Sequence, residues 1–141
     1  MRVDMEAIFG PMLGMFVLTF VVWVYMFAKR IPWITNANLA NDELTPLYFL
    51  QNTPPDVAAP SDNFKNLFEV PVIFYALCLY LYVTQQVDQI HVICAWVFFC
   101  FRALQSIMHC TANVVIVRFW LYAIATLALL LMVVRALIHY I

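Results

Sequence analysis

Two groups of polar side chains interrupt the apolar runs of this sequence at helical spacing, and the first lies in NFKNLFEVPVIFY, residues 63 to 75. Asn63, Asn66 and Glu69 fall three residues apart there, so a helix would place them on one face. Pro71 follows closely, and a proline inside a membrane helix bends the axis and leaves a backbone carbonyl without its usual donor. The stretch predicts a polar edge with a carboxylate beside a kink.

The second group is a stripe along one helical face, made of Arg102, Gln105, Ser106, His109 and Asn113. An arginine at membrane depth costs on the order of 3 kcal/mol, so it should face protein or water and find a partner. Glu69 is the only acidic residue within the four expected spans. We therefore expect Glu69 and Arg102 to pair, within one subunit or between two. Alternatively, such a pair only fixes the register between two helices.

Arg118 stands at the start of the last apolar run, shortly after this stripe. A fixed cation at the mouth of a polar cluster would favour a thiolate over a thiol, and each unit by which it lowers the thiol pKa corresponds to about 1.4 kcal/mol. The alternative interpretation is an ordinary arginine at the membrane boundary, with its charge in water.

The elements that must position these groups are membrane helices. Of the 141 residues, 66% are hydrophobic and 11% are charged, against roughly 25% charged residues in soluble domains. Apolar windows long enough to cross a bilayer lie at about 8–28, 64–84, 90–109 and 118–140. We therefore predict an all-α integral membrane four-helix bundle, forming a single domain over residues 1–141. The net charge of −1 argues against nucleic acid as a partner, and no metal site is predicted.

The segment 29–63 is expected to be a cytoplasmic loop, because it is rich in proline, asparagine and aspartate, with PSD at 60–62 capping the next helix. Positive charges are held on the cytoplasmic side of a membrane. One side would carry Lys29, Arg30, Lys65 and Arg118, and the other Arg2 and Arg135. This distribution predicts an inner-membrane protein with both termini outside the cytoplasm.

NFKNLFEVPVIFY, with Asn66, Glu69 and Pro71, resembles the second-helix motif of the MAPEG family, the membrane-associated proteins of eicosanoid and glutathione metabolism. RALQSIMHCTANVVIVR, residues 102 to 118, resembles the microsomal glutathione transferase branch, with His109 where that branch has a tyrosine. Asp62 stands where glutathione-binding members usually have an arginine. The resemblance covers Ile8 to Tyr140.

The resemblance implies a bacterial-type homotrimer that uses glutathione, or another thiol, as co-substrate in a transferase or peroxidase reaction on lipophilic electrophiles. Arg118 would stabilise the thiolate as the catalytic residue. The thiol would be bound by Arg30, Asn66, Glu69, Arg102 and His109. The remaining partners would be lipids and lipophilic small molecules.

Two other functions remain open from the residues alone. A small proton-coupled exporter of lipophilic cations would use Glu69 as its single membrane carboxylate. A non-catalytic, lipid-binding scaffold of the same fold would keep the assembly without activating a thiol.

Overall fold

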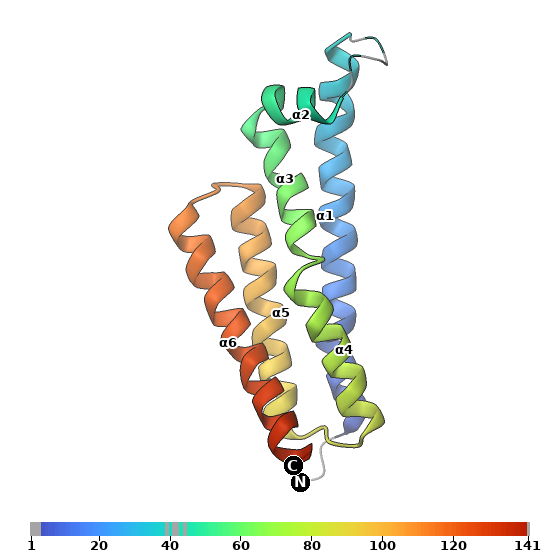
Figure 1. Cartoon of the computed structure of the whole chain (residues 1–141), viewed down its shortest axis with the longest axis vertical. Coiled ribbons are helices and arrows are strands. Elements are labelled where there is room, and N and C mark those ends of the chain that lie inside the picture. The colour runs from blue at the N-terminus through green and yellow to red at the C-terminus, as the bar shows by residue number, and fades with distance from the viewer. Residues whose placement is uncertain (1–3, 39, 41–42, 44, 141) are drawn as a thin grey trace.

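The structure, a computed structural model, describes residues 4–38, 40, 43 and 45–140 and is all-helical over them (Figure 1). Its elements are a 3-10 helix η1 (Met5–Ile8) and the α-helices α1 (Phe9–Asn36), α2 (Pro46–Asn52), α3 (Pro55–Asn66), α4 (Val70–Val83), α5 (Gln89–Cys110) and α6 (Val115–Tyr140). Four segments are long and apolar enough to cross a membrane: Met5–Asn36, Pro55–Val83, Gln89–Cys110 and Val115–Tyr140. The predicted all-α membrane bundle is confirmed.

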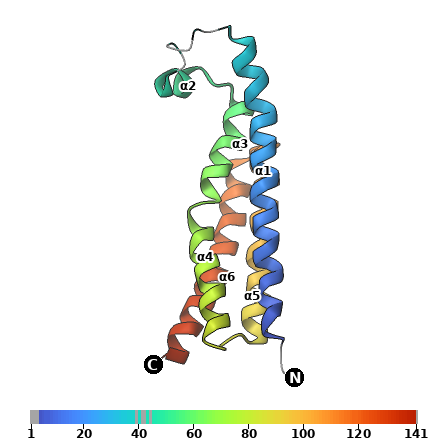
Figure 2. The same ribbon diagram turned by 90° about the vertical axis from the view of Figure 1, so that its right-hand side faces the viewer.

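The four spanning segments run alternately up and down, so the start of η1 and the end of α6 lie at the same end of the bundle (Figures 1 and 2). The short helix α2 lies across the opposite end, where α1 and α3 extend beyond the turn that joins α5 to α6. Lys29, Arg30, Lys65 and Arg118 belong to the half of the bundle near α2, whereas Arg135 lies at the other end. Arg2 is outside the described residues.

The expected loop over residues 29–63 is wrong for most of its length. Helix α1 continues through Pro32 to Asn36, and α2 and α3 occupy much of the remainder. Pro46 and Pro55 each stand at the start of a helix, where the missing N–H breaks no hydrogen bond and the fixed φ favours helix. Likewise PSD, residues 60 to 62, lies inside α3 and does not cap the next helix.

The expected helix over 64–84 is also corrected, because the second span is interrupted. Helix α3 ends at Asn66, three non-helical residues follow, and α4 begins at Val70 with Pro71 in its first turn (Figure 1). The predicted distortion beside Glu69 is thus a full break between two helices, and it separates Asn66 from Glu69.

The bundle is held by close apolar contacts between helices. The Phe74 ring on α4 stacks on Phe98 of α5 with ring centroids 4.4 Å apart, and both side chains are buried. Helix α1 approaches α5 at Gly14, where a Cβ atom would lie 2.9 Å from the Phe99 ring. Many large apolar side chains on the outer faces are exposed, which suits contact with lipid or with another subunit.

Candidate functional site

Polar residues from α3, the α3–α4 break, α5 and the start of α6 converge on a pocket of about 490 Å³ at the α2 end of the bundle. It is lined by Pro55, Ala58, Ala59, Asp62, Lys65, Asn66, Glu69, His109, Asn113 and Arg118. Of the site residues predicted from sequence, the pocket brings together Asn66, Glu69, His109 and Arg118.

Arg102 does not line this pocket and is 1% exposed. Its Nη2 donates to the backbone carbonyl of Asn66 at 2.6 Å, and its Nη1 donates to Oε1 of Gln105 at 2.8 Å. The Asn66 carbonyl is available because α3 ends there, and the last carbonyls of a helix have no donor within it. The missing N–H of Pro71 would free the carbonyl of Leu67, whereas the carbonyl that Arg102 binds is that of Asn66, which is free because α3 ends there. The guanidinium also lies 5.6 Å from the centre of the Tyr122 ring.

The expected pairing of Glu69 with Arg102 is wrong within one chain. Glu69 is exposed and takes part in none of the ion pairs among the described residues. The helix break explains the difference, since it turns Glu69 out of the α3 face and offers Arg102 a carbonyl instead. A pair between two subunits stays a prediction.

A second set of contacts joins α3 to α5 beside the pocket. Ser106 donates its hydroxyl to Oδ1 of Asn63 at 3.3 Å, and Nδ2 of Asn63 lies 3.5 Å from Sγ of Cys110. His109 belongs to the same turn of α5 and is 2% exposed, but its Nδ1 is buried without a hydrogen-bond partner among the described residues. This corner of the bundle is thus polar, and Nε of Arg102 and Nε of Arg118 are likewise buried without a partner among the described residues.

Arg118 also lines the pocket and is bonded to Asn113, which lies in the connection between α5 and α6. Its Nη1 donates to Oδ1 of Asn113 at 2.5 Å. Asn113 has a φ of 50°, in the left-handed region that asparagine tolerates better than most residues. The backbone turn and its side chain therefore together aim the arginine at the pocket.

Arg30 lies apart from this pocket, in a neighbouring one of about 570 Å³ between α1, α2 and α3. The neighbouring pocket is lined by Arg30, Pro46, Phe49, Leu50, Thr53, Val57, Ala58, Ser61, Asp62 and Lys65. The Arg30 guanidinium lies 4.7 Å from the centre of the Phe49 ring. Ala58, Asp62 and Lys65 line both pockets, so α3 forms the wall between them.

Sequence reasoning did not include Asp62 and Lys65 among the site residues, although both line the pocket and are joined by an ion pair of 3.2 Å. Asp62 was assigned to the loop over 29–63 and Lys65 to the start of the helix over 64–84, whereas α3 carries both. The signal that could have identified them is the start of α3, because Pro54 and Pro55 followed by Asp56 are typical of a helix N-terminus.

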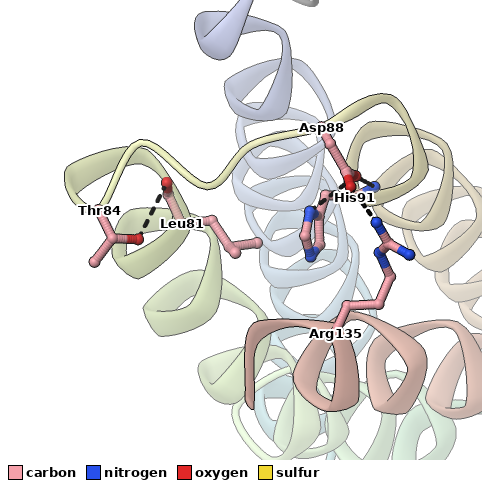
Figure 3. Close-up of polar contacts among 5 residues, drawn as sticks. All are labelled: Leu81, Thr84, Asp88, His91 and Arg135. Atoms are coloured by element: carbon pink, nitrogen blue, oxygen red, sulfur yellow. Dashed lines mark hydrogen bonds and ion pairs between the residues drawn. The ribbon is translucent and has the colours of Figure 1, made fainter. Parts of the chain in front are cut away.

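The opposite end of the bundle carries a separate polar cluster (Figure 3). Asp88 caps α5 by accepting a hydrogen bond from the backbone N–H of His91 at 2.8 Å, and its other carboxylate oxygen pairs with Arg135 of α6. Burial alone would raise the pKa of the Asp88 carboxyl, but the hydrogen bonds from His91 and Arg135 outweigh it and hold that pKa below its ordinary value. This cluster ties α5 to α6 far from the pocket.

Comparison with protein-family models gives a match to the MAPEG family over residues 8–138, which is nearly the whole chain. The match includes every residue that lines the pocket. Comparison with curated proteins and with solved structures finds no match.

Proposed function

This chain belongs to the MAPEG family, and on that premise we propose that it is a membrane transferase or peroxidase that activates glutathione, or another small thiol, for reaction with lipophilic electrophiles. Family membership by itself supports a function of the glutathione- and eicosanoid-related kind. The more specific proposal, activation of a small thiol, rests on the polar pocket, which is lined by Arg118, His109, Asn66 and Glu69.

The charges of the pocket offer partners for the sulfur and the ammonium group of a peptide thiol. Lys65 and Arg118 supply two cations, and Asp62 and Glu69 supply two carboxylates. Glutathione carries two carboxylates, one ammonium group and the thiol. Since Lys65 already pairs with Asp62, Arg118 is the cation left for the sulfur, while the exposed Glu69 is suited to the ammonium group.

Arg118 stabilises the negative charge that appears on sulfur when the thiol loses its proton. In the transferase reaction, the thiolate lone pair forms a bond to an electrophilic carbon, and the bond to the leaving group breaks with its electron pair. A guanidinium suits this role because it stays charged at any physiological pH and presents several donors.

The neighbouring pocket supports the proposed binding of a lipophilic electrophile. Its walls include the apolar side chains of Phe49, Leu50 and Val57, and it meets the polar pocket along α3 at Ala58. An apolar acceptor bound there would lie next to a hydrophilic thiol without sharing its site.

We further propose the homotrimer and the orientation expected from the sequence, with the pocket end in the cytoplasm and the protein in a bacterial inner membrane. The exposed apolar faces of the helices support burial against lipid and neighbouring subunits. Exposure of Glu69 supports contact with a second subunit.

The test is an ultraviolet difference titration of the purified protein with glutathione, which follows formation of the thiolate. We expect a thiolate signal at neutral pH that Arg118→Ala reduces by at least about tenfold, corresponding to about 1.4 kcal/mol. Lys29→Ala is the matched control, because Lys29 pairs with Asp56 and lines neither pocket. A wild-type protein without a thiolate signal, or an Arg118→Ala signal equal to that of the control, would refute the proposed catalysis.

A further inference from the structure

His109 combines two properties that point to a contact with the bound thiol. It lines the polar pocket, and its side chain is 2% exposed with Nδ1 buried and unpartnered among the described residues. A buried polar nitrogen without a partner costs about 1–3 kcal/mol, so a guest group or water that bonds the ring would relieve that cost. A neutral imidazole has one ring nitrogen that can accept a proton.

The groups around His109 come from each element that forms the pocket. Asp62 and Lys65 belong to α3, Glu69 to the α3–α4 break, Arg118 to α6, and Arg102 lies on the same helix, α5. A guanidinium is a donor only, so Arg118 can stabilise a thiolate but cannot accept the proton. Asp62 is engaged by Lys65. A proton acceptor distinct from the stabilising cation is therefore needed, and the imidazole is placed for it.

We propose that His109 is the general base that takes the proton of the bound thiol, while Arg118 stabilises the negative charge left on the sulfur. This inference rests on the proposed function. The S–H bond breaks, its electron pair stays on sulfur, and the proton moves to a ring nitrogen of His109. After the thiolate has formed its bond to the electrophile, the imidazolium returns the proton to the leaving group or to water, and the ring is neutral again.

Stopped-flow mixing of the purified protein with glutathione tests this role, because it separates the rate of thiolate formation from its final extent. We expect His109→Ala and His109→Gln to slow the rate at least about tenfold, since general base catalysis typically contributes about 10²- to 10⁴-fold. Free imidazole should restore His109→Ala in a concentration-dependent way, because that substitution leaves room for the ring. It should not restore His109→Gln, which fills the space without a basic group.

His139→Gln is the control, because His139 is exposed and lies at the opposite end of the bundle. It should keep the wild-type rate. Glutamine at position 109 keeps volume and hydrogen-bonding capacity, and circular dichroism of each variant establishes that the helices remain. A wild-type rate in folded His109→Gln, or a slow His109→Ala that imidazole leaves unchanged, would overturn the inference.

The two proposals fail in different ways. If the wild-type protein forms no thiolate at all, the proposed function falls, and the role of His109 falls with it. If an Arg118-dependent thiolate forms equally fast in wild type and His109→Gln, only the proton-acceptor role is lost.

Discussion

Arg118 at the start of α6 donates a hydrogen bond of 2.5 Å to the side-chain oxygen of Asn113, which stands just before that helix. The contact fixes the direction of the one cation that the proposed reaction needs at the sulfur. A charged substitution at position 113 should therefore change the electrostatic effect of Arg118 without altering the arginine side chain.

Asn113→Asp should weaken thiolate formation. The substitution keeps the size of the side chain and a residue type that tolerates the φ of 50°. It adds a carboxylate that competes with the thiolate for Arg118, and we expect the thiolate signal to fall about tenfold. Asn113→Gly, which keeps the backbone without the competing charge, should lose less. Ultraviolet titration with glutathione measures both, and equal signals in wild type and Asn113→Asp would contradict the electrostatic role of Arg118.

Arg102→Met should destabilise the bundle by about 2–3 kcal/mol. It removes charge-assisted hydrogen bonds to the Asn66 carbonyl and to Gln105, and it leaves one partly buried and one buried acceptor without a donor. Arg102→Lys should recover part of the loss, because an ammonium group can reach one acceptor but cannot match the planar fork. Denaturant titration in detergent, followed by circular dichroism, gives the change in the free energy of unfolding. An unchanged unfolding midpoint in Arg102→Met would show that the hydrogen bond from Arg102 to the Asn66 carbonyl does not stabilise the helix break.

Asp88 should give the bundle an acid-sensitive contribution to stability. Its folded pKa lies below the unfolded value of about 3.9, so the contribution is present above that value and is lost as the pH falls through the folded pKa. Asp88→Asn should remove this acid dependence while keeping the cap on His91, since asparagine also caps helices. At neutral pH it should cost no more than about 1 kcal/mol, because the pair with Arg135 is partly exposed to solvent.

Unfolding midpoints measured from pH 7 downward check the prediction for Asp88. The matched control is Asp56→Asn, which breaks the more exposed pair with Lys29. A wild-type protein whose midpoint falls in parallel with that of Asp88→Asn would exclude a distinct contribution from the Asp88 carboxylate.

Gly14→Ala should destabilise the contact between α1 and α5 by about 1 kcal/mol net. The added Cβ would lie 2.9 Å from the Phe99 ring, and overpacking costs about 1–3 kcal/mol, which exceeds the 0.5–1 kcal/mol that alanine contributes to a helix. Gly10→Ala is the matched control, because its Cβ would stand 3.1 Å from the outer ring of an exposed Trp96 that can shift. It should be neutral or slightly stabilising.

The prediction for Gly14 is sharpened by a second substitution. Phe99→Leu removes the ring that the new methyl group meets, so Gly14→Ala should become neutral or stabilising in that background. Thermal unfolding of the two single variants and the double variant measures the coupling. Additive effects would mean that the methyl group finds space elsewhere.

The sequence predicted the membrane helices and the polar face of α5 because both follow from periodicity. Gln105, Ser106 and His109 share the face that Arg102 begins, as helical spacing requires, and all are buried in the structure. Length and hydropathy alone were enough for the spans, since unpaired backbone groups are too costly in lipid for other forms.

The segment before the second span was misjudged for a physical reason. Proline breaks a helix in its interior but favours one at its first positions, and composition does not distinguish the two cases. Pro46 and Pro55 are at such first positions. The position of Glu69 could not be predicted either, because it depends on where a helix breaks in three dimensions and on which acceptor Arg102 finds there.

The break between α3 and α4 has a consequence for biosynthesis. The carbonyl of Asn66 is satisfied by a side chain 36 residues further along the chain, so the second span cannot reach its final shape when it first leaves the ribosome. Until the third span is inserted beside it, the Asn66 carbonyl must be hydrated or bonded to another donor. We therefore expect the second and third spans to reach their final structure together, when Arg102 of α5 bonds the carbonyl at the end of α3.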